Sequence, residues 1–282
     1  MVELTYLGTA TLALTIGGTR ILTDPAFDQA GATYDFGPWY TPRSWFASEK
    51  RYDTPVGPAA SGTFDAVLVS HDQHADNLDH AGRALVADPE RAARVVTTVA
   101  GARRLARPVS GKDGPGRGLG LGERVIGLAP GAGTRVGAVT ITATLARHGP
   151  FYAPQVHEVV GFLLDVESGP RIWISGDTVL YPALAAELAE LGLRRPVDVA
   201  VVHCGAVRFP RVPVLGKERF TFDAREAIEA CRLVQARKIV PVHRSGWSHF
   251  LQPEAELEAA FASSELAERT TVLDLGATLR LT

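Results

Sequence analysis

The chain has 282 residues, of which 46% are hydrophobic and 21% charged, and its 29 basic residues are balanced by 31 acidic ones. This length suits one large globular domain or two small ones. The balanced charge argues against nucleic-acid binding through a general electrostatic field, and the normal apolar fraction argues against disorder. Two cysteines cannot form a disulfide framework. The eight histidines are therefore the residues to follow.

The sequence gives no sign of export or of membrane insertion. Its opening, MVELTYLGTATLALTIGGTR, lacks a basic start, a long apolar run and a small-residue cleavage site. Nowhere does an apolar stretch reach the ~18 residues that span a bilayer. We therefore expect a cytoplasmic protein without a membrane segment.

Apolar periodicity predicts strands in the first part of the chain and strand–helix pairs later. Gly17-Gly18 predicts a hairpin turn between two N-terminal strands. We expect a single domain, 1–282, made of two similar halves, about 1–150 and 151–282. Further strands are predicted at 66–70, 95–99, 124–128, 139–146, 161–166, 171–175, 197–202, 238–242 and within 270–281, and helices at 79–87, 101–106, 182–191, 223–235 and 253–261.

Residues 28–62 are rich in glycine, proline and aromatic residues. They are too many for a simple connection, and long loops of this kind commonly bind ligands or cover sites. The aromatic side chains of this segment either form a lid over a site or pack within the loop itself. They are Trp39, Tyr40, Trp45 and Phe46.

The segment 70–80 follows a predicted buried strand and reads SHDQHADNLDH. Three imidazoles and three carboxylates in ten residues exceed what a solvated loop usually holds. One interpretation is a polar helix start with an aspartate cap. The other is a metal site, because loops at strand ends present their side chains at one edge of a sheet.

Three later strands also end on a histidine or an aspartate: His148, Asp177 and His243. If these strands lie in one sandwich, all the ends can converge on one edge. Imidazole and carboxylate ligands suit Zn²⁺, Mn²⁺ or Fe²⁺. A set of five or six such ligands with one bridging carboxylate suits two ions about 3.5–4 Å apart.

These motifs give the chain a resemblance to the metallo-β-lactamase superfamily over nearly its whole length. They are, in order, YLGTATLAL…ILTDP, the histidine cluster, His148, SGDT around Asp177, and PVH at His243. The TDP and HRSGWSHF segments are most similar to cytoplasmic hydrolases of the ascorbate-6-phosphate lactonase type. The resemblance implies an α/β (α+β) fold, a four-layer αββα sandwich with a metal site at one edge.

The first cluster departs from the family pattern His-x-His-x-Asp-His. Without a gap, only His71 matches, and Gln73 takes the second histidine position. With one inserted residue, His71, His74 and Asp76 match, and Asn77 replaces the last histidine. We favour the reading with the insertion.

On this reading, the resemblance assigns each ligand to an ion. His71, His74 and His148 resemble the ligands of the first ion, and Asp177 resembles the bridging carboxylate. The second ion would take Asp76 and His243, with Asp76 also orienting the attacking water. Further candidate ligands are Gln73, Asn77 and His80.

Several other residues are candidates for contact with the substrate. His203, at the end of strand 197–202, would be a catalytic general acid, a substrate contact or a structural residue. His157, Arg244, Trp247 and His249 would line the substrate pocket, with Arg244 contacting an anion.

The sequence thus predicts a metal-dependent hydrolase in which a metal-bound hydroxide attacks a small ester, lactone, thioester or phosphoester. We expect one or two divalent ions, Zn²⁺ before Mn²⁺ or Fe²⁺, and a small-molecule substrate. Nucleic acid and membrane are not expected partners, and homo-oligomer formation stays open. The alternatives are a mononuclear isomerase or lyase, and a binding protein with a degenerate site.

Overall fold

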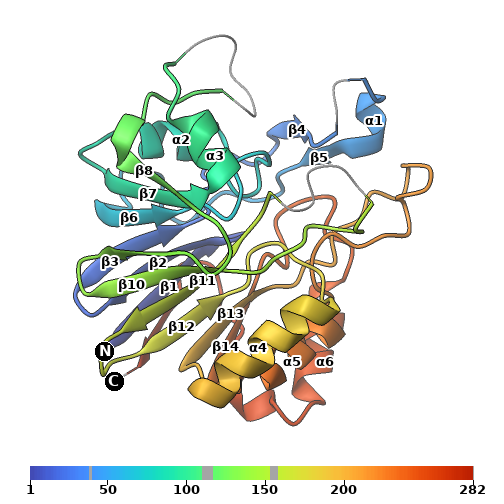
Figure 1. Cartoon of the computed structure of the whole chain (residues 1–282). Coiled ribbons are helices and arrows are strands. Elements are labelled where there is room, and N and C mark those ends of the chain that lie inside the picture. The colour runs from blue at the N-terminus through green and yellow to red at the C-terminus, as the bar shows by residue number, and fades with distance from the viewer. Residues whose placement is uncertain (38–39, 110–116, 153–157, 282) are drawn as a thin grey trace.

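The computed structural model describes residues 1–37, 40–109, 117–152 and 158–281. Two β-sheets face one another, with helices on their outer faces (Figure 1). This arrangement is the predicted αββα sandwich.

The first sheet has seven strands in the order β15-β1-β2-β3-β6-β7-β8. Gly17 and Gly18, with φ of 56° and 77°, form the predicted turn between β2 and β3, because a two-residue hairpin turn of this type needs positive φ. Strands β3, β6, β7 and β8 pair in parallel. The bounds are β1 Val2–Gly8, β2 Thr11–Ile16, β3 Thr19–Thr23, β6 Phe64–Leu68, β7 Ala92–Thr98, β8 Val125–Leu128 and β15 Thr278–Leu281.

The second sheet has six strands in the order β14-β13-β12-β11-β10-β9, with β12, β13 and β14 parallel. The chain changes sheet between β8 and β9, earlier than residue 150. Strand β15 then returns to the first sheet, and it is the one strand described within 270–281. The bounds are β9 Gly133–Val136, β10 Val139–Thr144, β11 Gly161–Val166, β12 Arg171–Ile174, β13 Val199–His203 and β14 Lys238–Val242.

Helices α2 and α3 cover the first sheet, and α4, α5 and α6 cover the second (Figure 1). Asp79 and Asp223 cap α2 and α5, where their side chains accept the backbone N–H groups of Gly82 (2.7 Å) and Glu226 (2.9 Å). The bounds are α2 His80–Ala87, α3 Val99–Leu105, α4 Pro182–Arg194, α5 Ala224–Leu233 and α6 Glu254–Ala262, with 3₁₀ turns at Gly122–Arg124 and Ala267–Arg269.

Strand β13 shows how the apolar pattern builds the layers. Val199 and Val201 pack between the two sheets, whereas Ala200 and Val202 pack under the outer helices. Successive side chains of a strand point to opposite faces, so a strand buried on both faces is apolar throughout. The strand ends on His203, which is fully buried.

The segment 28–62 is more ordered than a loop. It contains the short helix α1 (Arg43–Phe46) and the hairpin of β4 (Thr33–Asp35) and β5 (Ala47–Glu49). A bridge from Lys50 to Trp247 attaches it to the segment after β14. Of the expected lid residues, Phe46 is buried, Trp45 packs beside it, Tyr40 is exposed, and Trp39 lies outside the described residues.

Among the described helices, none has both the length and the hydropathy needed to cross a bilayer.

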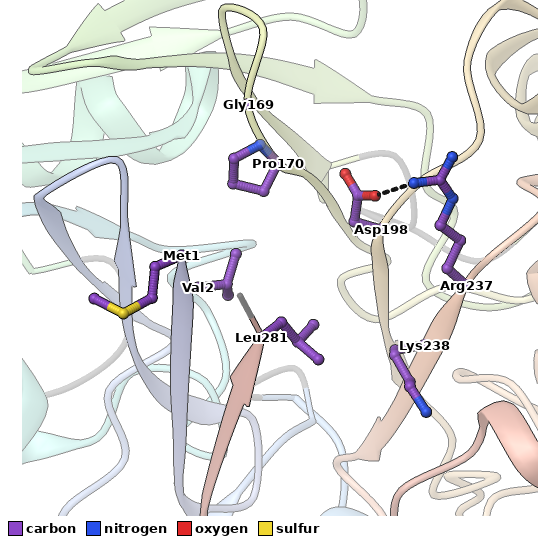
Figure 2. A pocket seen from close by; sticks show the side chains of 8 residues that line it. All are labelled: Met1, Val2, Gly169, Pro170, Asp198, Arg237, Lys238 and Leu281. Atoms are coloured by element: carbon purple, nitrogen blue, oxygen red, sulfur yellow. Dashed lines mark hydrogen bonds and ion pairs between the residues drawn. The ribbon is translucent and has the colours of Figure 1, made fainter.

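A hollow of about 390 Å³ lies at the end of the sandwich where β1, β13 and β14 begin (Figure 2). Its charged side chains include the ion pair of Asp198 with Arg237, 2.9 Å apart. The candidate ligand His243 follows the opposite end of β14, so this hollow is separate from the site described below.

A buried ion pair joins the segment 28–62 to the cap of α2. Lys50 Nζ lies 3.7 Å from Asp79 Oδ2, and both side chains are fully buried. Lys50 also donates to the carbonyl oxygen of Ala26 at 2.7 Å. Burial raises the pKa of Asp79 to about 6 and lowers that of Lys50, because each charged form loses its hydration.

We predict that Asp79→Ala destabilises the fold by about 3–5 kcal/mol, because it leaves the Lys50 ammonium buried without its partner. Loss of the α2 cap in the same variant should lower the free energy of unfolding by about 1 kcal/mol more. Glu190→Ala, which breaks an exposed ion pair with Arg194, is the control and should cost less than about 1 kcal/mol. Urea unfolding measures both, and equal losses would contradict the prediction.

Candidate metal centre

Six predicted ligands meet at the edge of the sandwich where the central strands end. His71, His74 and Asp76 follow β6 of the first sheet, and His148, Asp177 and His243 follow β10, β12 and β14 of the second. They form two groups, His71–His74–His148 and Asp76–Asp177–His243, whose ligand atoms lie within 4.8 Å of one another in each group. We call these the imidazole triad and the carboxylate triad.

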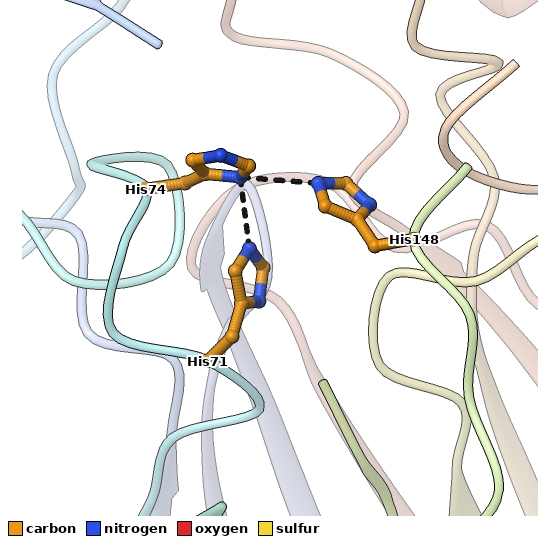
Figure 3. Close-up of side chains that lie close together, drawn as sticks. All are labelled: His71, His74 and His148. Atoms are coloured by element: carbon orange, nitrogen blue, oxygen red, sulfur yellow. Dashed lines mark hydrogen bonds between the residues drawn. The ribbon is translucent and has the colours of Figure 1, made fainter. Parts of the chain in front are cut away.

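In the imidazole triad, three ring nitrogens point at one place (Figure 3). His74 Nδ1 lies 2.9 Å from His71 Nε2 and 3.0 Å from His148 Nε2. His148 Nδ1 lies 2.8 Å from the carbonyl oxygen of Phe220, which can only accept a hydrogen bond. Nδ1 of His148 therefore carries the hydrogen, and its Nε2 presents a lone pair to the triad.

Burial keeps two of these imidazoles neutral. Burial, with a smaller contribution from the neighbouring His148, lowers the pKa of His74 to about 4. Burial, together with His74 and His148, holds the pKa of His71 well below its usual value. A neutral imidazole is the form that binds a metal ion.

In the carboxylate triad, His243 Nε2 lies 3.2 Å from Asp76 Oδ2 and 3.4 Å from Asp177 Oδ2. All three side chains are almost fully buried. Burial alone would raise the pKa of Asp177, but the field of His243 and the hydrogen bond from His203 outweigh burial and hold that pKa below its usual value. The same attraction raises the pKa of His243 against the effect of burial.

Asn77, which the reading with one inserted residue sets at the last histidine position of the pattern, lies between the two carboxylates. With its amide nitrogen turned toward them, it donates to Asp76 Oδ1 at 3.1 Å and to Asp177 Oδ2 at 3.3 Å. Its oxygen then faces the hydroxyl of Ser70. Asn77 is thus placed to hold the carboxylates in position rather than to bind an ion.

His203 contacts the centre through Asp177. Its Nδ1 lies 2.8 Å from Asp177 Oδ1, and its ring stacks on His243 with 5.3 Å between centroids. The side chain is almost fully buried, and its Nε2 has no hydrogen-bond partner among the described residues. This placement suits the orientation of Asp177 better than contact with a substrate.

Gln73 and His80 lie away from both triads. Gln73 donates to Glu158 at 2.8 Å, and Glu158 in turn pairs with Arg104. His80, half-exposed at the start of α2, contacts the hydroxyl of Tyr34 at 2.8 Å. The structure therefore gathers His74, not Gln73, with the other histidines, as the inserted residue predicts.

The predicted pocket residues have other contacts. Arg244 is buried, forms an ion pair with Glu254 and donates to the carbonyl oxygen of Leu273 at 2.8 Å. Trp247 is buried and donates to the hydroxyl of Thr9 at 3.2 Å. Arg244 is thus paired with Glu254 and Trp247 packs beside Thr9; their predicted contacts with a substrate stay predictions.

The two predicted pocket histidines differ. His249 is buried beside the carboxylate triad, with Nε2 3.1 Å from Asp76 Oδ2. Sequence position alone could not show this contact, because 173 residues separate the two. His157 lies outside the described residues.

Aromatic rings surround the histidines. Phe36 lies 5.2 Å from His74, and Phe250 lies 4.3 Å from His243, measured between ring centroids. Phe36 also belongs with Phe46, Phe209 and Phe220 to one apolar cluster. Such surroundings strengthen electrostatic interactions at the centre by excluding water.

The ligand atoms of the two triads are of the kinds that bind divalent cations. Hydrogen bonds among the three rings cannot satisfy the imidazole triad, because His74 Nδ1 carries at most one hydrogen and faces two nitrogens. In the carboxylate triad, two buried anions face one imidazole. Both arrangements suit an ion with imidazole and carboxylate ligands.

Comparison with known proteins agrees with this fold. A family model described as the β-lactamase superfamily domain matches residues 19–244. A metal-dependent hydrolase from Nitratidesulfovibrio vulgaris is 28% identical over 253 residues, covering 88% of this chain and 81% of that protein.

Two solved structures share the fold. A possible metal-dependent hydrolase from Veillonella parvula has a TM-score of 0.77 at 17% identity, with 100% of both chains covered. An isothiocyanate hydrolase from Delia radicum gut bacteria has a TM-score of 0.73 at 18% identity, with 99% of both covered.

The chain therefore belongs to the metallo-β-lactamase superfamily. Within that superfamily it is a metal-dependent hydrolase.

The position of the inserted residue can be tested with two neighbouring variants. His74→Ala should lose tight binding of one divalent ion, because it removes one of three convergent nitrogens. Gln73→Ala should keep wild-type metal content, because Gln73 contacts Glu158 instead. Elemental analysis after dialysis measures both, and the reverse order of losses would favour the alignment without a gap.

Proposed function

We propose that the protein hydrolyses a small ester, lactone or thioester with two divalent ions, one at each triad. The observation that carries this proposal is the adjacency of a three-imidazole group and a group of two carboxylates and one imidazole. Asp177 acts electrostatically on histidines of both groups, His71 and His243. It is thus suited to bridge the two ions.

His71, His74 and His148 would hold the first ion, and Asp76, Asp177 and His243 the second. Zn²⁺ is our first choice for the imidazole triad, because three neutral imidazoles are a frequent zinc ligand set. Bound divalent ions lower the pKa of water and polarise carbonyl or phosphoryl oxygens.

The side chains divide the remaining work. Asp76 would accept a hydrogen bond from the attacking water and orient it toward the substrate carbon. His203 and Asn77 hold Asp177, and Phe220 orients His148 through its carbonyl oxygen. The water oxygen would become bonded to the acyl carbon as the bond to the leaving oxygen or sulfur breaks, and the proton that the water loses would pass to the leaving group.

The surroundings favour a substrate with an apolar part. The cluster of Phe36, Phe46, Phe209 and Phe220 lies beside the histidines. Arg244, the predicted anion contact, already pairs with Glu254. We therefore place phosphoesters behind carboxylic esters, lactones and thioesters.

Removal of metal is the first test. Purified protein should contain close to two equivalents of divalent ion, and a chelator should abolish hydrolysis of a panel of esters, thioesters and lactones. Addition of Zn²⁺ or Mn²⁺ should restore it. Protein that is free of metal after gentle purification, and that binds none on titration, would refute the proposal and favour a binding protein.

Asp177→Ala should reduce hydrolysis by at least about 100-fold, because loss of groups that merely orient ligands already costs about 10–100-fold. Glu190→Ala, on an exposed helix surface, is the control. Steady-state kinetics on the best substrate of the panel measures the effect. Full activity of Asp177→Ala would exclude a two-ion mechanism.

A further inference from the structure

We propose that His249 is a ligand of the second ion, in place of the histidine that Asn77 replaces. The inference rests on the proposed function, since it needs an ion at the carboxylate triad. It makes the second site Asp76, Asp177, His243 and His249.

Two imidazole nitrogens converge on one carboxylate oxygen. His249 Nε2 lies 3.1 Å from Asp76 Oδ2, and His243 Nε2 lies 3.2 Å from the same atom. The side chains of all three residues are at most 3% exposed. His249 therefore has the same relation to Asp76 as the ligand His243.

A hydroxyl group on the far side of the ring can set its tautomer. His249 Nδ1 contacts the hydroxyl of Ser48, which also lies 3.1 Å from the hydroxyl of Ser248. If Nδ1–H donates to Ser48, Ser48 donates to Ser248, and Nε2 presents a lone pair to the Asp76 carboxylate. Two acceptors at that distance repel one another unless a cation lies at the site.

Asn77 cannot supply the missing ligand in this arrangement. Its amide nitrogen is used by Asp76 and Asp177, and its oxygen faces Ser70. The second site then has only three ligands from the triad. His249 approaches Asp76 from another part of the chain and supplies a fourth ligand.

The segment that carries His249 is held in place. The backbone N–H of Ser248 donates to the carbonyl oxygen of Glu49 at 3.0 Å, and Lys50 forms an isolated antiparallel β-bridge with Trp247. The ring of Phe209 stacks on that of His249 with centroids 5.4 Å apart. The ring is therefore positioned before an ion arrives, which lowers the entropic cost of binding.

The test is a metal titration of chelator-stripped full-length protein, with Zn²⁺ followed by calorimetry and Co²⁺ by its visible spectrum. Wild-type protein should bind two equivalents. His249→Ala should bind the first with unchanged affinity and the second at least 10-fold more weakly. His80→Ala is the matched control, because it removes a histidine outside both triads, and it should match wild type.

Two further variants separate coordination from packing. In His249→Gly, free imidazole should restore binding of the second Co²⁺ together with its spectrum. Ser48→Ala keeps the imidazole but removes its hydroxyl partner, and it should lower the affinity for the second ion by about 10-fold. Ser48→Ala also provides the measurement if the His249 variants do not fold, as judged by circular dichroism.

Second-ion affinity within 2-fold of wild type in His249→Ala, with two ions still bound, would overturn the role of His249 alone. Wild-type affinity in Ser48→Ala, if the His249 variants are unfolded, would do the same. A wild-type protein that binds fewer than two ions would overturn the two-ion proposal as well.

Discussion

The centre depends on one electrostatic constraint: buried lone pairs and negative charges face one another at the end of the sandwich. His74 meets two imidazole nitrogens at 2.9 and 3.0 Å, and His243 meets two carboxylates. Without compensation, such groups are costly to bury. A divalent cation at each triad would remove that cost, and a second layer of contacts holds the candidate ligands in place.

The second layer serves orientation. The carbonyl oxygen of Phe220 fixes the tautomer of His148, and His203 and Asn77 restrain Asp177. Arg104 pairs with Asp72 at 2.7 Å and with Glu158 at 2.7 Å, which fixes the backbone that carries His71 and His74. None of these contacts requires a long sequence motif. Each contact forms because the fold brings together segments that follow the ends of different strands.

Local patterns in the sequence were sufficient for most of the elements. Strands β11 (Gly161–Val166) and β14 (Lys238–Val242) have the predicted bounds, and α5 (Ala224–Leu233) lies within the helix predicted at 223–235. The six convergent ligands also followed from strand ends together with the family resemblance. The segment 28–62 was expected to be a loop, because it shows no long apolar period. Its short helix and strands are held instead by contacts with the segment after β14, which the local sequence does not show.

The positions of Arg244, Trp247 and His249 could not be read from sequence. All three follow His243 within six residues, yet one pairs with Glu254, one packs against Thr9 and one contacts Asp76. The contacts with Thr9 and Asp76 join residues far apart in the sequence, which only the folded chain brings near. The departure from the histidine motif at Asn77 signalled that something differed in the second site, but not where a replacement would come from.

The division of ligands between the two sheets links ion binding to the stability of the whole sandwich. Each triad takes ligands from both sheets, so an ion bound there fastens one sheet to the other. Binding energy that the unfolded chain cannot capture is added to the free energy of unfolding. An ion bound at either triad would therefore make the stability of the whole sandwich depend on the concentration of free metal.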